Sequence, residues 1–260
     1  MPRFAHALAV LAVAALAPAA ALAADVHVMI SAGFFHAYSE LVPRFEKESG
    51  HHVITVRGPS MGDSPEAIPT RLARGEAADV VILDGATADE LAKRGLVKEG
   101  TQTVLAKSLI GMVVKEGAPK PDISTVDAFR KTLLDAMSVA YSDSGSGTYI
   151  STRLLDKLGV ADQVKPKSRK VRGPPSGEPV AAVVARGDAQ IGFQQVSELI
   201  NVRGTTFVGA IPAELQPGFT FAGGLTAHAR EGDAGQALIR FLASPQAAPA
   251  IEKAGLAPPN

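Results

Sequence analysis

Four short segments of the sequence carry hydroxyl or amide side chains, in three of them together with glycine, a composition suited to binding an anion. They cover residues 31–33, 57–64, 141–149 and 193–198. Backbone N–H groups and hydroxyls at the start of a helix donate hydrogen bonds, and the helix dipole favours negative charge there. An ordinary helix cap followed by a turn has the same composition. Because four such segments occur in one chain, we predict an anion-binding cleft to which several of them contribute.

Arginines beside these segments would supply the charge-assisted donors that a multivalent anion needs. Arg57 ends a strand-like run at the expected mouth of the cleft, which makes it the strongest candidate. Arg71 lies beside the second segment, and Arg153 lies one helical turn beyond the third. For Arg71 and Arg153, a surface position with a solvent or acidic partner is the alternative.

The same cleft could also transfer a proton, which requires a general base within reach of the substrate. The candidate bases near the four segments are His36, Asp63, Glu66, Tyr149 and Glu178. Histidine is the residue type whose ordinary pKa lies near neutrality, and His36 closely follows the first segment. A position on an exposed helix surface is the alternative for His36.

The sequence lacks the residues that several other kinds of functional site require. With no cysteine, the chain has no disulfide, zinc–thiolate site or thiol nucleophile. No segment matches the phosphate-binding patterns G-x-x-x-x-G-K-[ST] or G-x-G-x-x-G. His51 and His52 are adjacent on a strand and would point to opposite faces, so we predict no metal site. The chain has 26 basic and 26 acidic residues, which argues against nucleic-acid binding; the basic run at 165–170 is interpreted as a solvated face.

Strand-like and helical stretches alternate along the chain, which predicts an α/β fold. Strands are expected at 26–31, 52–56, 78–83, 110–115, 138–141 and 191–193, and helices at 37–48, 68–74, 88–94, 127–137, 149–158, 179–186 and 236–242. This order requires mostly parallel sheets with helices on both faces, and ligands bind at the carboxyl ends of such strands. We expect two lobes, with the chain crossing near residues 107–114 and returning near 219–226.

The first 23 residues have the composition of a signal peptide. Arg3 precedes an apolar stretch, and Ala21 to Ala23 provide a small-x-small cleavage pattern. Pro18 and the strand-like sequence from Val26 onward argue against a membrane anchor. We therefore predict cleavage near Ala23, export to the periplasm and no membrane span in the mature chain. Without Arg3, the mature chain has 25 basic and 26 acidic residues and a net charge of about −1.

Five strings, in this order and spacing, resemble the periplasmic substrate-binding proteins of bacterial molybdate-type ABC importers. The strings are VMISAGFFHAY, ARGEAADVVI, SGTYISTRLLDKLG, IGFQQVSE and FLASPQAAPAIEKAGL. The resemblance implies a class II periplasmic-binding-protein fold. In this fold two lobes, each a mixed, mostly parallel sheet flanked by helices, are joined by two hinge crossings and close over a ligand. We expect residues 24–106 and 223–260 to form lobe 1 and residues 107–222 to form lobe 2. The family also implies an ABC permease as a partner.

The residues expected at the ligand depart from the family pattern. Molybdate binders of this family carry a serine where this chain has Gly33, and Ser31 stands two places earlier. The tyrosine of their fourth loop corresponds to Gln195. A longer loop, residues 58–64, replaces their second serine-rich loop, whereas the helix start with Gly147 and Thr148 is retained.

Four strings, GPSMG, AIPTRLARGE, YSDSGSGTY and GFQQVSEL, resemble a divergent subgroup that includes bacterial aconitate isomerase. The first expectation is therefore a solute-binding protein that captures a small multivalent anion, an organic di- or tricarboxylate such as aconitate. The alternative is an isomerase that interconverts trans- and cis-aconitate by allylic proton transfer in the same cleft. Molybdate or tungstate binding ranks third. None of these functions requires a metal or an organic cofactor, and a monomer suffices.

The segments and the resemblance together define the candidate site. The expected ligand-binding residues are Ser31, Gly33, Arg57, Ser60, Met61, Gly62, Ser144, Gly147, Thr148, Tyr149 and Gln195. If the protein is an isomerase, the expected catalytic residues are His36 and Tyr149.

Overall fold

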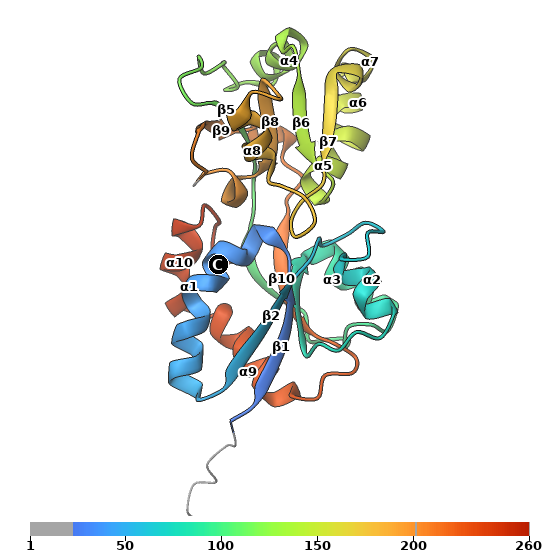
Figure 1. The fold of residues 1–260 in the computed structure, drawn as a ribbon, viewed down its shortest axis with the longest axis vertical. Helices are drawn as coiled ribbons and strands as arrows, with labels where there is room; N and C mark the ends of the chain where they lie inside the picture. The colour runs from blue at the N-terminus through green and yellow to red at the C-terminus, as the bar shows by residue number, and fades with distance from the viewer. Residues whose placement is uncertain (1–22, 201, 260) are drawn as a thin grey trace, which may run out of the picture.

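The computed structural model describes residues 23–200 and 202–259, which form two lobes, each built on one five-stranded sheet (Figure 1). The prediction of a two-lobed α/β fold is confirmed. The predicted signal peptide falls on residues 1–22 and Ala23, almost wholly outside the described residues. No helix within the described residues is both long and apolar enough to cross a bilayer.

The first lobe contains the sheet with strand order β2-β1-β3-β10-β4. Its strands are β1 (Asp25–Ile30), β2 (His52–Arg57), β3 (Val80–Asp84), β4 (Thr103–Lys107) and β10 (Thr220–Leu225). Its helices are α1 (Ala32–Ser49), α2 (Ile68–Ala73), α3 (Gly85–Lys93), α9 (Gly232–Leu242), the 3-10 turn η5 (Pro245–Ala247) and α10 (Ala248–Lys253). Strands β1, β2 and β3 are parallel, whereas β10 is antiparallel to both β3 and β4.

The second lobe contains the sheet with strand order β7-β6-β8-β5-β9. Its strands are β5 (Ile110–Lys115), β6 (Val139–Ser142), β7 (Ser168–Val171), β8 (Ile191–Gln195) and β9 (Thr205–Ala210). Its helical segments are α4 (Val126–Asp135), α5 (Gly145–Tyr149), the π-helical turn η1 (Ile150–Leu154), α6 (Leu155–Lys157), α7 (Ala161–Val164), η2 (Lys165–Lys167), α8 (Val180–Arg186), η3 (Val196–Glu198) and η4 (Ala213–Leu215). Strand β6 is parallel to β7 and β8, and β5 is antiparallel to β8 and β9.

Both faces of each sheet are buried, because alternate residues of every strand point to opposite sides. In the first lobe Val28 and Ile82 pack with α1, α9 and α10, whereas Met29 and Val81 pack with α2 and α3 on the other face. The second lobe repeats this arrangement, with α4 to α7 on one face and α8 on the other. Each lobe therefore has its own core and can hold its loops rigidly at the cleft.

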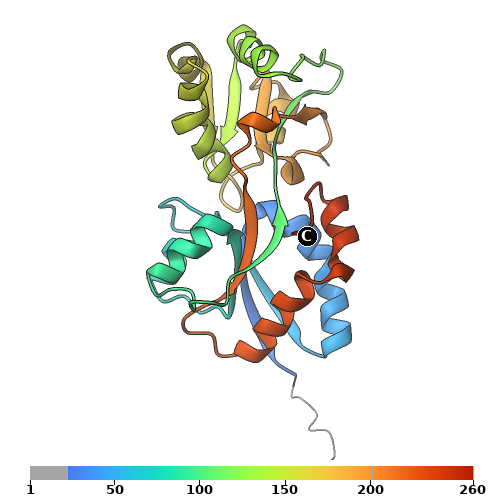
Figure 2. The ribbon, with the colours of Figure 1, turned by 180° about the vertical axis from the view of Figure 1, so that it is seen from behind.

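Two extended segments join the lobes, and they run side by side through the neck of the molecule (Figure 2). One leads from β4 through Ser108 and Leu109 into β5, and the other returns through Phe219 into β10. The two are hydrogen-bonded, with the Ser108 N–H donating to the Phe219 carbonyl at 2.8 Å. The lobe limits expected at residues 107 and 222 stay a prediction.

Several elements differ from the expected ones. Helix α1 begins at Ala32 rather than at residue 37, so Gly33 and His36 lie inside a helix and not in a loop. Strands β4, β7, β9 and β10 were not predicted as strands, and residues 219–226 were expected only as the return crossing between the lobes. Strand β7 covers part of the basic run at 165–170, and it is an edge strand on which Arg169 and Lys170 are exposed. Charged side chains are common on edge strands. Because of them, β7 lacks the hydrophobic pattern from which a strand is predicted.

Candidate functional site

A small cavity of about 30 Å³, which we call the inner cavity, lies between the lobes at the carboxyl ends of β1, β2, β6 and β8. The predicted ligand residues that line it are Ser31, Gly33, Arg57, Ser60, Ser144 and Gln195. The lining residues that sequence reasoning did not select include Asp143, Pro174, Gln194, Glu198 and Phe221. The four segments thus converge as expected for ligand sites in open α/β sheets.

Two buried donors at the inner cavity have no hydrogen-bond partner within the described part of the chain: the Ser31 hydroxyl and the Arg57 Nε. Ser31 is only 4% exposed and directly precedes α1, but its hydroxyl does not cap that helix. The first N–H groups of an α-helix also lack intrahelical partners, and α1 is 18 residues long. Buried polar groups are normally satisfied, so these donors indicate a site for an acceptor-rich ligand.

Arg57 is held in place by the end of its strand and by an aromatic ring. Its backbone pairs with Ile30 at the end of β2, and its guanidinium carbon lies 4.1 Å from the ring centroid of Phe35. The cation–π contact fixes the guanidinium at the mouth of the inner cavity. Its buried Nε can then meet a carboxylate without a large loss of side-chain entropy.

The two lobes are in contact at Gly33. A Cβ atom on Gly33 would clash with the Phe221 ring and lie 2.5 Å from the Gln195 Oε1. The Ser197 hydroxyl donates a 2.7 Å hydrogen bond to the Gly33 carbonyl, and the Ser108 hydroxyl donates to the Gln195 Oε1 at 3.1 Å. A side chain at residue 33 would therefore displace Phe221 within the first lobe and the Gln195 side chain of the closed second lobe.

A second cavity, which we call the outer chamber, adjoins the inner cavity and has a volume of about 180 Å³. Arg57, Gln194, Glu198 and Pro174 line both spaces. His36 lines only the outer chamber and is exposed on α1. The inner cavity and the outer chamber are therefore neighbouring spaces, and the side chains of Arg57 and Glu198 border both of them.

The remaining predicted residues lie elsewhere. Met61, Thr148 and Tyr149 line a separate side chamber of about 440 Å³, together with Asp84 and Arg153. The Tyr149 hydroxyl donates to the Leu215 carbonyl at 2.7 Å, and burial raises the Tyr149 pKa. Gly147 packs against the Ser142 carbonyl so closely that no Cβ would fit. Gly62 is exposed and lines none of the three spaces among the described residues.

Comparison with known proteins gives the same architecture. The family model described as bacterial extracellular solute-binding protein matches residues 26–257. The chain belongs to this solute-binding protein family. It is 45% identical over 231 residues to aconitate isomerase from Pseudomonas sp., covering 89% of this chain and 87% of that protein.

Molybdate-binding proteins are more distant relatives of this solute-binding protein. It is 26% identical over 246 residues to the molybdate-binding protein ModA of Azotobacter vinelandii, covering 93% of each chain. The solved Azotobacter vinelandii periplasmic molybdate-binding protein superposes with a TM-score of 0.71 at 20% identity, covering 90% of this chain and all of that one. The structural likeness shows a shared fold, and the divergent subgroup predicted from the sequence is confirmed.

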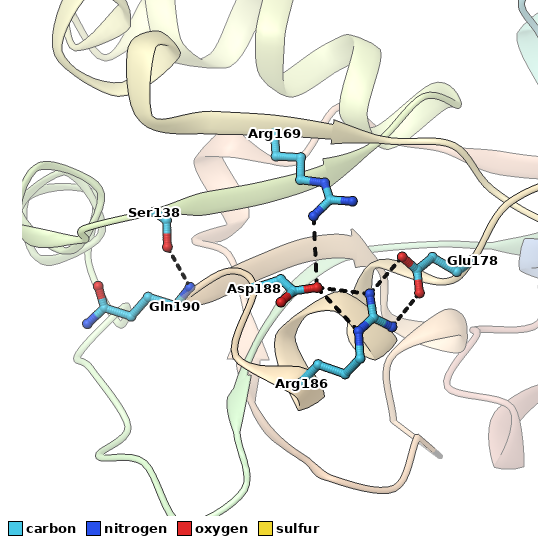
Figure 3. Close-up of polar contacts among 6 residues, drawn as sticks. All are labelled: Ser138, Arg169, Glu178, Arg186, Asp188 and Gln190. Atoms are coloured by element: carbon cyan, nitrogen blue, oxygen red, sulfur yellow. Dashed lines mark hydrogen bonds and ion pairs between the residues drawn. The ribbon is translucent and has the colours of Figure 1, made fainter.

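Most of the candidate bases lie away from the ligand site of the solute-binding protein. Figure 3 shows Glu178 in an exposed network, where its two carboxylate oxygens accept hydrogen bonds from Arg186 at 2.5 and 2.9 Å. Arg186 holds the pKa of Glu178 below its usual range, which suits an ion pair and not a base. Asp63 is exposed, and neither Asp63 nor Glu66 lines the three spaces defined by the described residues.

The described residues of the solute-binding protein form neither a serine-hydrolase site nor a metal site. Ser60 lies in a G-x-S-x-G string, Gly58 to Gly62, but its hydroxyl accepts from the Asp84 N–H at 3.1 Å and no histidine lines the inner cavity. A serine nucleophile needs an adjacent base, so this string does not form a hydrolase site. Within the described ranges, no cluster of three or more His, Asp or Glu side chains is arranged to hold a metal ion.

Proposed function

We propose that this protein captures a tricarboxylate between its lobes and interconverts trans- and cis-aconitate. The observation that carries the proposal is the pair of buried, unpartnered donors, the Ser31 hydroxyl and the Arg57 Nε, at one cavity. A carboxylate supplies the acceptors that these donors lack. The identity to aconitate isomerase, 45%, supports this ligand class over an inorganic oxyanion.

The size of the site favours an elongated ligand. The inner cavity, at about 30 Å³, has room for about two water molecules. A tricarboxylate is larger, so only one of its carboxylates occupies the inner cavity while the rest extends past Arg57 into the outer chamber. Opening at the two hinge segments would admit the ligand, and closure would exclude water.

The reaction is a proton transfer along an allylic system. A base removes a proton from the substrate methylene, and donors stabilise the negative charge that spreads into the adjacent carboxylate. Ser31 and Arg57, which line the inner cavity, and the first N–H groups of α1 would stabilise that charge. This role needs donors in a dry site, where each hydrogen bond is strengthened by the low dielectric.

Capture without turnover is the second candidate function, and the family membership favours it. In that case the protein delivers its anion to an ABC permease. Molybdate is a poor fit to this chain, because the family's serine at residue 33 would collide with Phe221 and Gln195. Both functions are consistent with export to the periplasm after cleavage near Ala23, and with a monomer, since one chain supplies every residue of the cleft.

Turnover of trans-aconitate by the purified protein tests the proposal. We expect cis-aconitate to accumulate when its formation is followed chromatographically, and calorimetry to show binding of trans-aconitate but not of molybdate. Tight binding of trans-aconitate without turnover would leave only the capture function. Tight binding of molybdate with no response to tricarboxylates would overturn the proposal.

A further inference from the structure

Glu198 belongs to the fourth segment expected at the cleft, but it was not among the expected ligand-binding or catalytic residues. It is the last residue of η3, the short turn that follows β8, and it lines both the inner cavity and the outer chamber. Arg57 lines the same two spaces from the opposite lobe. A ligand carboxylate held by Arg57 therefore places the adjacent carbon atoms beside the Glu198 carboxyl.

Neighbouring hydrogen bonds hold Glu198 in this position. The Gln194 Oε1 accepts from the Val180 N–H at 3.2 Å, so the Gln194 amide nitrogen is the group that donates to Glu198. On the other side of the turn, the Ser197 hydroxyl is bound to the Gly33 carbonyl of the first lobe. Lobe closure through Ser197 thus brings the Glu198 carboxyl to the ligand.

The surroundings of Glu198 favour its neutral form, whereas the surroundings of a solvent-exposed glutamate favour the ionised form. Loss of hydration raises its pKa to about 7, against the opposing effects of the Gln194 hydrogen bond and the Arg57 charge. The other titratable groups at the same spaces are His36 on α1 and Asp143 after β6. A general base is most effective when its pKa lies near the working pH.

We propose that Glu198 is the general base that removes the allylic proton and the acid that returns it, an inference that rests on the proposed isomerase function. The geometry supports one group for both steps, because Glu198 is the carboxyl of the described residues that lines both the inner cavity and the outer chamber, as Arg57 does. His36, the base expected from the sequence, lines only the outer chamber.

The proposed step balances without a co-reactant. A Glu198 carboxylate oxygen takes a proton from the substrate methylene, the C–H bond breaks, and its electron pair spreads over the allylic carbons and the attached carboxylate. The Glu198 carboxyl then returns the proton to the carbon that was vinylic, a new C–H bond forms there, and the double bond has moved by one position. Nothing is oxidised or reduced, and Glu198 ends ionised, ready for the next turnover.

Substitution of Glu198 by its amide tests this role directly. Glu198→Gln keeps the shape and removes the base, so we expect kcat for trans-aconitate to fall by about 10²–10⁴-fold. Binding of trans-aconitate, measured by calorimetry at about pH 6, should stay within about threefold, because a neutral glutamine replaces a mostly neutral carboxyl. Glu198→Asp retains a base at a longer distance and should keep measurable activity. In the wild type, log kcat/KM should rise with pH and level off above about pH 7, because kcat/KM reports the pKa of the free enzyme.

Glu178→Gln is the matched control, since Glu178 is exposed and paired with Arg186 outside the cavities. It should turn over trans-aconitate at the wild-type rate. Wild-type turnover combined with a fully active Glu198→Gln variant would overturn the role of Glu198 and leave the isomerase function standing. Absence of wild-type turnover would overturn the isomerase function, and the catalytic role of Glu198 with it.

Discussion

The hydroxyl of Ser197 in the second lobe donates a 2.7 Å hydrogen bond to the backbone carbonyl of Gly33 in the first lobe. The bond is buried and joins residues 164 positions apart in the sequence. Ser197 lies next to Glu198, and Gly33 lies in the first turn of α1. One hydrogen bond therefore couples closure of the lobes to assembly of the ligand site.

Removal of this hydroxyl should weaken ligand binding. In Ser197→Ala the closed state loses a hydrogen bond worth about 1 kcal/mol, and the Gly33 carbonyl is left unpaired unless the lobes open. Because the ligand is bound in the closed state, its apparent affinity should fall about fivefold. Calorimetric titration with trans-aconitate measures the change.

Ser244→Ala is a suitable control, because it removes a hydroxyl-to-carbonyl bond of the same 2.7 Å length within the first lobe, to Phe241. It should lower stability slightly and leave affinity unchanged. Equal loss of affinity in both variants would show that the Ser197 bond has no special role in closure.

The close approach at Gly33 makes this position intolerant of a side chain. Gly33→Ser introduces a Cβ that collides with the Phe221 ring of its own lobe and, in the closed state, with the Gln195 side chain of the second lobe. Overpacking of this kind costs about 1–3 kcal/mol, so binding of trans-aconitate should weaken by about 5- to 150-fold, and no molybdate binding should appear. Calorimetry with each anion measures both effects.

Gly232→Ser provides the comparison, because a Cβ on Gly232 meets nothing within 4 Å. We expect its affinity and melting temperature to match those of the wild type. Gain of tight molybdate binding by Gly33→Ser would contradict the view that Phe221 and Gln195 close this position.

Local sequence patterns were sufficient to predict those elements of the fold that depend mainly on neighbouring residues. Val80 to Leu83 are apolar because β3 is buried on both faces, and this pattern predicted a buried parallel strand. Ser31 and Arg57 could be selected because each ends or follows a strand, where α/β sheets bind ligands. The order of strands in each sheet was not predictable, since it depends on pairings such as β3 with β10, which lie far apart in the chain.

Contacts between distant residues account for what sequence reasoning missed. Tyr149 was expected at the ligand, but its hydroxyl is bound to the Leu215 carbonyl, 66 positions away, and faces the side chamber. Glu198 lies within the fourth segment, residues 193–198, yet nothing nearby in sequence distinguishes it from a surface glutamate. Its position at the cleft depends on closure of the two lobes around Arg57.

Replacement of Arg57 tests the anchor of the carboxylate. Lysine keeps the charge but loses the planar guanidinium that stacks on Phe35 and donates through Nε. We expect Arg57→Lys to bind trans-aconitate about tenfold more weakly. Arg44→Lys is the matched control, because the Arg44 guanidinium also lies over a phenylalanine ring, that of Phe241, at 5.9 Å and away from the cleft. Unchanged affinity in Arg57→Lys would remove Arg57 from the ligand site.

The raised pKa of Glu198, from 4.5 to about 7, predicts that this residue costs stability at high pH. Its protonation favours the folded state, so its contribution is complete below about pH 4.5 and is lost as the pH rises through 7. Glu198→Gln cannot ionise, so at about pH 8 its free energy of unfolding should exceed that of the wild type by on the order of 2 kcal/mol. Glu178→Gln should change stability in the opposite direction, because Arg186 lowers the pKa of Glu178. Denaturant unfolding at about pH 4.5 and pH 8 measures both, and a Glu198→Gln gain that is equal at the two pH values would rule out a raised pKa.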